Sequence, residues 1–183
     1  RVALGWACWK TYLGRPEADY DRCSAMTALG AALGSKEARA PEALPVLKAS
    51  LALRRRYWSH DVQGILDAQA NVAICLSTLR REDEALVLLR ENYARQVALF
   101  GVSHKSSVAS GYVLTNSFFR LKLFDEAIQF MRDQLRPAAE KALGSDNDIT
   151  LKINTNLSEN LASNPESTRE DVLEAKTILQ DVV

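Results

Sequence analysis

Histidine and cysteine, which often act as general bases, nucleophiles or zinc ligands, are few in this 183-residue chain. It has two histidines, His60 and His104, and three cysteines, Cys8, Cys23 and Cys75. The cysteines are widely spaced, form no Cys-x-x-Cys pair, and lie far in the sequence from either histidine. This spacing excludes the usual zinc motifs and argues against a disulfide framework. We therefore expect reduced thiols in an intracellular, cytoplasmic protein.

Acid–base chemistry would need carboxylates held together in a dry cleft. The run Glu82-Asp83-Glu84 has the right residue type, but it falls on a turn at a predicted helix start, where it is solvated. The sequence contains no P-loop, G-x-G-x-x-G, G-x-S-x-G or H-E-x-x-H motif. His60 and His104 fall in linkers, where we expect them to bond to the next helix start instead of acting as bases or ligands. These observations predict a protein that is not an enzyme and has no metal site and no cofactor.

The composition is that of a globular domain, with 47% hydrophobic and 25% charged residues. Basic and acidic residues number 23 each, so the chain lacks the basic excess typical of nucleic-acid binding and has no charge that favours an anionic membrane. No apolar run is long enough to span a bilayer. The one basic cluster, Arg54-Arg55-Arg56, lies at a predicted helix C-terminus, where cations are favoured in any case. We expect neither nucleic acid nor a membrane as partner.

The elements that position the histidines, cysteines and carboxylates are predicted to be helices. Leu86, Leu89, Tyr93 and Val97 recur at steps of three and four, which places them on one helical face. Glycine and proline are sparse, and no hairpin signal appears, so the predicted class is all-α. Residues 1–13 are apolar, but Trp9-Lys10-Thr11 interrupts them. We interpret them as the tail of a preceding repeat, and the chain as a fragment of a longer protein, and not as a signal peptide.

Three landmarks recur at a nearly constant period. A Glu-Ala pair begins at residues 42, 84, 126 and 174, and a large–small–x–x–large group begins at residues 29, 72, 114 and 157. The pairs Phe100-Gly101 and Leu143-Gly144 are 43 residues apart. The small residue of the second group is needed where one helix crosses its partner closely; it is Gly30, Ala73, Thr115 or Ser158. A fixed period of this length indicates a helical repeat array.

The landmarks predict one array over residues 1–183, in which four helix pairs follow the segment 1–13. The pairs are 20–33 with 41–57, 62–79 with 83–100, 106–121 with 124–143, and 149–162 with 170–183. Pro137 lies inside a predicted helix, where it should kink the helix or remove hydrogen bonds, because proline has no N–H to donate.

These residues resemble the tetratricopeptide repeat (TPR) family, in the 42-residue subtype of kinesin light chain. The most specific stretch runs Asn71-Val72-Ala73-x-x-Leu76, then Asp83-Glu84-Ala85, then Phe100-Gly101-x-x-His104, in the order of that subtype. The fourth repeat offers Asn156-Leu157-Ser158-x-x-Leu161. The first and third repeats have Ala28 and Val113 where the asparagine would stand, so there the resemblance rests on the packing positions alone.

The resemblance implies a right-handed superhelix of antiparallel helix pairs, whose first helices line a concave groove that holds a peptide. Carried over by register, the groove-facing residues are Asp67, Asn71, Ile74, Tyr112, Asn116, Phe119, Lys152, Asn156 and Glu159. Asparagine amides donate and accept hydrogen bonds, so they suit a peptide backbone, although Asn71 and Asn156 would equally satisfy a neighbouring helix. Tyr112 and Phe119 would be aromatic anchors or packing between repeats, and Lys152 would meet a carboxylate.

We therefore predict a non-catalytic protein–protein interaction scaffold whose partners are proteins or peptides. Two alternatives stay open. In the first alternative, the repeats form a structural spacer or dimerisation arm, whose groove would not need polar and aromatic residues. Otherwise they form the regulatory repeat region of a larger enzyme.

Overall fold

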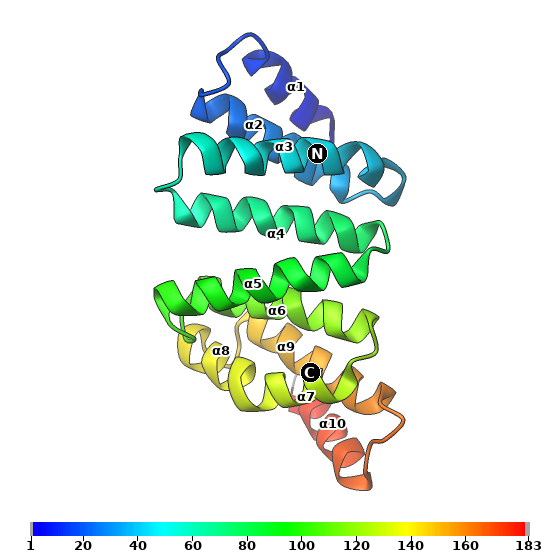
Figure 1. Ribbon diagram of the computed structural model, residues 1–183. Coiled ribbons are helices and arrows are strands. Elements are labelled where there is room, and N and C mark those ends of the chain that lie inside the picture. The colour runs from blue at the N-terminus through cyan, green and yellow to red at the C-terminus, as the bar shows by residue number, and fades with distance from the viewer. Residues whose placement is uncertain (1, 182–183) are drawn as a thin grey trace. The chain divides into compact units, whose positions relative to one another are not determined.

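The computed structural model describes residues 2–181, which form helices joined by short turns and contain no strand (Figure 1). The helices are α1 (Val2–Tyr12), α2 (Tyr20–Gly34), α3 (Ala40–Tyr57), α4 (Val62–Thr78), α5 (Glu82–Phe100), α6 (Lys105–Arg120), α7 (Phe124–Phe130), α8 (Arg136–Leu143), α9 (Asp148–Ser163) and α10 (Arg169–Asp181). A 3-10 turn (Glu37–Arg39) precedes α3, and a π-helical turn (Met131–Leu135) joins α7 to α8. The predicted all-α fold is confirmed.

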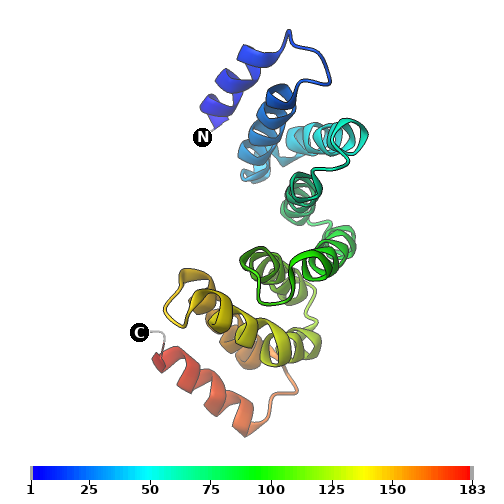
Figure 2. The same ribbon diagram turned by 90° about the vertical axis from the view of Figure 1, so that its left-hand side faces the viewer.

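The chain divides into two compact units, residues 1–88 and 89–183, and the boundary falls within α5. In the first unit α2 packs against α1, α3 and α4 (Figures 1 and 2). In the second unit α9 packs against α6, α7, α8 and α10. Each unit is thus built from antiparallel pairs whose first helices are neighbours. A single array over all 183 residues stays a prediction.

Small residues lie where the helices cross, as predicted. Ala73, Thr115 and Ser158 are at most 1% exposed, and Gly30 is buried as well. A Cβ atom added to Gly30 would lie 2.6 Å from Cδ2 of Leu47, so any side chain there would displace Leu47 of α3. The alanines of the Glu-Ala pairs are also buried, at 0% exposure for Ala43, Ala85 and Ala127 and 5% for Ala175. The repeat period of the sequence is therefore the spacing at which small residues are needed for close contacts between helices.

Each first helix begins with a side chain that caps it. The carboxylates of Asp19 and Asp61 accept hydrogen bonds from the backbone N–H groups of Arg22 and Gly64, at 2.9 and 3.0 Å. Nδ1 of His104 accepts from Ser106 N–H at 3.2 Å, and Asn147 Oδ1 accepts from Ile149 N–H at 3.0 Å. These bonds satisfy donors that a helix start leaves free. The predicted structural role of His104 is confirmed.

Two turns of the same shape, one in each unit, join a first helix to a second. Arg80 and Lys122 adopt left-handed conformations with φ of 61° and 58°. Beyond them, Arg81 N–H bonds to the Leu76 carbonyl and Leu123 N–H to the Phe118 carbonyl, both at 3.0 Å. This is the Schellman arrangement, which usually has glycine at the left-handed position.

The glycines of the Phe100-Gly101 and Leu143-Gly144 landmarks have a comparable backbone role. Their φ angles are 84° and 91°, a region that L side chains rarely adopt. The chain needs this backbone conformation where it leaves the second helices that end at Phe100 and Leu143, and glycine adopts it without strain.

The predicted effect of Pro137 is confirmed. Pro137 lies in the first turn of α8, directly after the π-helical turn Met131–Leu135. A proline ring clashes with the carbonyl four residues earlier and cannot donate to it. The wider π turn accommodates the missing bond and divides the predicted helix 124–143 into α7 and α8.

Within residues 2–181 no helix is long and apolar enough to cross a membrane.

Candidate peptide-binding surface

Two carboxylates of the run Glu82-Asp83-Glu84 have structural contacts. Glu82 accepts a hydrogen bond from Ser77 Oγ at 2.8 Å, and Glu84 pairs with Arg81 at 2.6 Å. The hydrogen bond from Arg81 lowers the pKa of the Glu84 carboxyl below its usual value. No group of three or more His, Cys, Asp or Glu side chains suited to a metal ion occurs in the described part of the chain.

Arg54 is a buried structural residue, which sequence reasoning did not distinguish from Arg55 and Arg56. Its guanidinium donates to Asp61 Oδ2 and to Ser24 Oγ, both at 3.3 Å, and lies 5.2 Å from the ring centre of Tyr20. Arg54 thus joins α2, α3 and the start of α4. Its helical spacing from the buried Leu47 and Leu51 is the signal that would have identified it.

The three cysteines are free, as expected for reduced thiols. Cys23 and Cys75 are buried, and Cys8 is exposed. Burial raises the pKa of the Cys75 thiol, whose sulfur donates to the Ala40 carbonyl at 3.4 Å. Cys8 is therefore the accessible thiol of the three.

In the first unit the predicted groove residues lie on α4 and do not form a network. Asp67 is exposed and accepts a hydrogen bond from Gln63 on the same helix at 2.8 Å. Asn71 is half-buried, and its side chain makes no hydrogen bond to any residue that the structure describes. Ile74 is 43% exposed. The corresponding positions on the neighbouring α2 are Ala28 and Ala31, which offer no polar atom in their side chains.

In the second unit the corresponding residues of α6 and α9 are joined by hydrogen bonds. Asn156 Nδ2 donates to Thr115 Oγ1 at 3.1 Å and to Asn116 Oδ1 at 2.9 Å. The Thr115 hydroxyl itself donates to the Tyr112 carbonyl at 2.7 Å, so it can only accept from Asn156. This fixes the orientation of the Asn156 amide. Both of its N–H groups therefore bond to the neighbouring helix, which was the alternative role considered for Asn156.

The Asn116–Asn156 pair keeps two polar atoms unbonded by described residues. They are Oδ1 of Asn156, an acceptor, and Nδ2 of Asn116, a donor. Both residues are half-buried, so these atoms lie at the surface of the unit. Sequence reasoning placed both asparagines on this face but missed Thr115, whose hydroxyl orients the pair. Thr115 was assigned only to close packing, because the other repeats have a small residue there.

Aromatic and charged side chains flank the pair at helical spacings. Tyr112 and Lys152 lie one turn before Asn116 and Asn156 on their own helices, and Phe119 and Glu159 lie one turn after. Phe119 is 38% exposed, and its ring packs edge-on against Phe124 of the same repeat, with 6.0 Å between centres. Lys152 and Glu159 are exposed and form no ion pair with the residues described.

An ion-pair cluster in the second unit involves the second helices and not this surface. Arg132 of the π turn donates to Asp171 at 2.6 Å and also contacts Glu174, both on α10. The hydrogen bond from Arg132, followed by those from Thr168, lowers the pKa of Asp171 to about 2. Sequence reasoning missed this cluster, because its members are about 40 residues apart.

Comparison with solved structures identifies the fold. No protein-family model and no curated protein sequence matches the chain. A single-substitution variant of nearly identical TPR-like repeats from Podosopora anserina matches 99% of this chain and 82% of its own, with a TM-score of 0.79 at 19% identity. The parent of that variant gives a TM-score of 0.77 at 19% identity. BtubC (BKLC) from P. vanneervenii gives a TM-score of 0.80 at 14% identity over 99% of this chain and 70% of its own.

The fold is therefore that of a TPR-like repeat protein, as the sequence predicted.

Proposed function

We propose that this chain is a non-catalytic, cytoplasmic scaffold that binds an extended peptide segment of a partner protein on the first-helix surface of α6 and α9. The observation that carries this proposal is the free donor and free acceptor of the Asn116–Asn156 pair. A peptide group has one C=O acceptor and one N–H donor, so it matches these two atoms in number and kind. Because the pair is held by Thr115, its side chains are already ordered before a ligand binds, which lowers the entropic cost of binding.

The flanking residues favour a peptide whose side chains follow a particular order. The aromatic rings of Tyr112 and Phe119 offer apolar contacts on either side of the pair, where aromatic anchors contribute most to binding. Lys152 lies at the Tyr112 end and Glu159 at the Phe119 end, and neither has a partner among the described residues. We infer a peptide with an acidic residue near Tyr112 and a basic residue near Phe119.

The substitution Asn116→Asp tests this proposal without breaking the pair. It keeps an oxygen that accepts from Asn156 and replaces the free Nδ2 donor with a second oxygen. The matched control is Gln129→Glu, which adds the same charge at an exposed position on α7. Peptides would be selected from a random displayed library against the intact wild-type chain and then measured by fluorescence polarisation.

We expect the selected peptides to bind the Asn116→Asp variant about tenfold more weakly, which is the loss of one hydrogen bond of about 1.4 kcal/mol. The Gln129→Glu variant should bind like wild type. Equal binding to both variants would place the ligand elsewhere. If no peptide is enriched, the chain is not a peptide scaffold, and the spacer interpretation gains.

One observation favours the dimerisation-arm alternative. Leu179 of α10 is 46% exposed, whereas its repeat equivalents Leu47, Leu89 and Met131 are at most 2% exposed. Val172 and Leu173 of the same helix are 54% and 55% exposed. Light scattering after size-exclusion chromatography would test this function, since a dimer that Leu179→Glu converts to a monomer would support it.

A further inference from the structure

A cleft of about 320 Å³ opens between α2 and α3 in the first unit, beside the loop that joins α1 to α2. Some of its lining residues are apolar and others are charged. The apolar ones are Met26 of α2 and Ala49, Ala52 and Leu53 of α3. The charged ones are Arg22 of α2, Arg56 of α3 and Glu17 of the loop. A cleft of this volume is at the small end of the range for sites that bind organic molecules.

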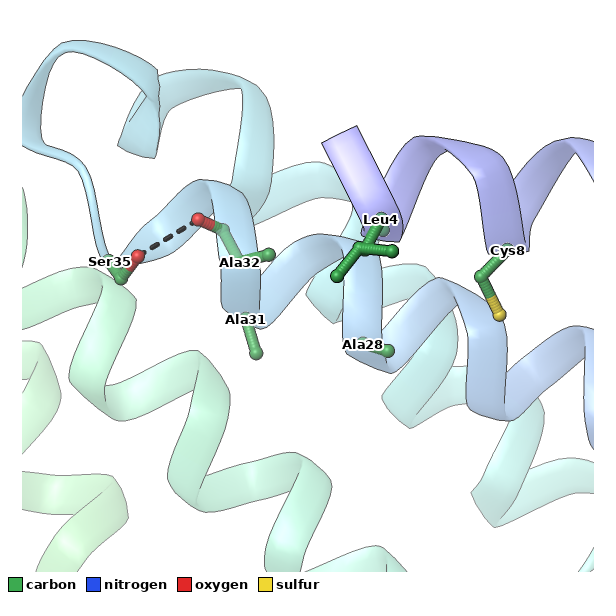
Figure 3. A pocket seen from close by; sticks show the side chains of 7 residues that line it. Leu4, Cys8, Ala28, Ala31, Ala32 and Ser35 are labelled. Carbon is green, nitrogen blue, oxygen red and sulfur yellow. Dashed lines mark hydrogen bonds between the residues drawn. The ribbon is translucent and has the colours of Figure 1, made fainter. Parts of the chain in front are cut away.

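The charged residues distinguish this cleft from a second one in the first unit. Figure 3 shows the second cleft, where Leu4 and Cys8 of α1 face the alanines of α2. Its described lining contains no arginine, lysine, aspartate or glutamate, so it offers no charge that would select a ligand. The cleft between α2 and α3 has two arginines in its lining.

The guanidinium of Arg22 is held in place but keeps donors without a partner. Its Nη1 atom donates to the backbone carbonyl of Arg15, and its Cζ atom lies 5.7 Å from the ring centre of Trp9. Its Nε atom is buried and has no hydrogen-bond partner within residues 2–181, and Nη2 bonds to none of these residues either. Nε and Nη2 form the edge of a guanidinium that holds a carboxylate through two parallel hydrogen bonds. A buried donor without an acceptor costs free energy, so an acceptor is expected there.

The next repeat has neither a charge nor an opening at this place. The 43-residue step between first helices places Ile65 of α4 at the position of Arg22. It likewise places Gln69 at the position of Met26. Ile65 and Gln69 are 8% and 0% exposed, whereas the two residues of α2 are half-buried. The charged opening is therefore not a general feature of the repeat architecture.

The second arginine of the cleft also lacks an acidic partner. On α5, one repeat later, Arg95 pairs with Glu91 one turn earlier, at 3.3 Å. On α3 the residue one turn before Arg56 is Ala52, so Arg56 has no such carboxylate on its own helix. Its guanidinium lies over the ring of Tyr57, 5.1 Å from the centre, and forms no ion pair with the residues described.

The lining carries two positive charges and one negative charge. The negative charge belongs to Glu17, which is exposed and pairs with neither arginine in the described part of the chain. A positive cleft with apolar walls complements a carboxylate that is carried on an apolar group.

We propose that this cleft binds a small organic acid. Nε and Nη2 of Arg22 hold its carboxylate, and its apolar body lies against Met26, Ala52 and Leu53. Arg56 adds a second positive charge near the carboxylate. The site belongs to the first unit and uses none of the residues of the peptide surface on α6 and α9, so it does not depend on the function proposed for that surface.

Octanoate is the probe, and isothermal titration calorimetry of the intact chain is the measurement. We expect a Kd of about 1 mM or below, as for a small ligand in an open cleft. Acetate has the carboxylate without the apolar body, and octylammonium has the same apolar body with a positive charge. Each should bind at least about tenfold more weakly than octanoate.

Three arginine variants locate the site. Arg22→Gln removes the guanidinium edge and should raise the Kd for octanoate about tenfold or more, because hydrogen bonds to a charged group are lost. Arg56→Gln should raise it about threefold, because Arg56 is exposed and contributes mainly its charge. The matched control is Arg55→Gln, which removes the same charge at an exposed position outside the cleft and should bind octanoate like wild type.

A second pair of variants leaves the contacts of Arg22 intact. Ala52→Glu places a carboxylate in the cleft from an exposed position on α3 and should abolish binding of octanoate. Ala52→Gln adds a side chain of the same size without the charge and should weaken binding less. Circular dichroism verifies that each variant stays folded, so that lost binding is not lost structure.

The proposal is overturned if octanoate at about 10 mM gives no heat of binding. It is also overturned if acetate binds as tightly as octanoate, or if Arg55→Gln weakens binding as much as Arg22→Gln does. Glu17→Gln tests whether Glu17 itself occupies the free edge of Arg22 in solution. We expect this variant to bind octanoate about threefold more tightly at unchanged stability, because a like charge is removed. A lower unfolding midpoint in urea with an unchanged Kd would make Glu17 the partner of Arg22 and would contradict a ligand site.

Discussion

Neighbouring first helices contact each other through different kinds of side chain in the two units. In the first unit α2 and α4 approach through Gly34, which has no side chain, and Cys75, whose thiol donates to the Ala40 carbonyl instead. In the second unit α6 and α9 are joined by the hydrogen bonds of Asn156 to Thr115 and Asn116. The repeat equivalents of Asn156 and Asn116 in the first unit are Asn71 and Ala31. Asn71 lacks a bond because alanine offers it no acceptor.

This difference indicates what each surface can bind. A face of small apolar residues admits another helix but gives an extended peptide nothing to bond with. A face with an ordered amide pair offers a donor and an acceptor at fixed positions, which suits a peptide backbone. The same fold thus presents two kinds of helix surface, and the difference arises from a few residues.

The units can be observed separately in one unfolding experiment. All three tryptophans, Trp6, Trp9 and Trp58, lie in the first unit. Tryptophan fluorescence therefore reports that unit, whereas circular dichroism reports both units.

The largest effect is expected from Gly30→Val, which tests close packing in the first unit. The new side chain would overlap Leu47, because even a Cβ atom would be 2.6 Å from its Cδ2 atom. We expect a loss of about 2–3 kcal/mol in the free energy of unfolding, measured by urea denaturation with tryptophan fluorescence. The control is Gly14→Ala, where an added Cβ atom meets nothing within 4 Å. A loss below that of the control would mean that α2 and α3 separate easily.

The second-largest effect is expected from Asn156→Ala, which is compared with Asn71→Ala in the first unit. Asn156→Ala removes two hydrogen bonds between helices and should lower the stability of the second unit by about 1 kcal/mol, seen by circular dichroism. Asn71→Ala removes no such bond, so we expect tryptophan fluorescence to show a change within about 0.5 kcal/mol. Equal losses in the two variants would contradict the contrast between the units.

The third prediction concerns a feature that the units share. Arg80→Gly and Lys122→Gly each relieve a left-handed conformation, and each should stabilise its own unit by about 0.5–1 kcal/mol. Arg80→Gly should shift the fluorescence transition in urea, and Lys122→Gly should shift the circular dichroism transition alone. A destabilised Lys122→Gly variant would show that contacts of the lysine side chain outweigh backbone strain.

The smallest effect is the pH dependence that Asp171 gives to the second unit. The folded pKa of Asp171 is about 2, below the unfolded value of about 3.9. The stability that its ionised form contributes is therefore complete above pH 4 and is lost as pH falls through about 2. Asp171→Asn should flatten this part of the curve of unfolding midpoint against pH. An identical slope for wild type and variant would contradict an ion pair with Arg132.

The sequence by itself determined the helix pairs, the repeat period and the positions of close contact. These follow from local rules, since Gly30 and Ala73 must be small wherever two helices cross at short distance. It also identified the repeat positions of Asn116 and Asn156. Only the tertiary structure decided how their amides are used, because Asn156 meets Thr115 across 41 residues of sequence. The burial of Arg54 and the pairing of Arg132 with Asp171 were likewise decided in three dimensions, since hydrogen bonds depend on distances that a sequence period does not specify.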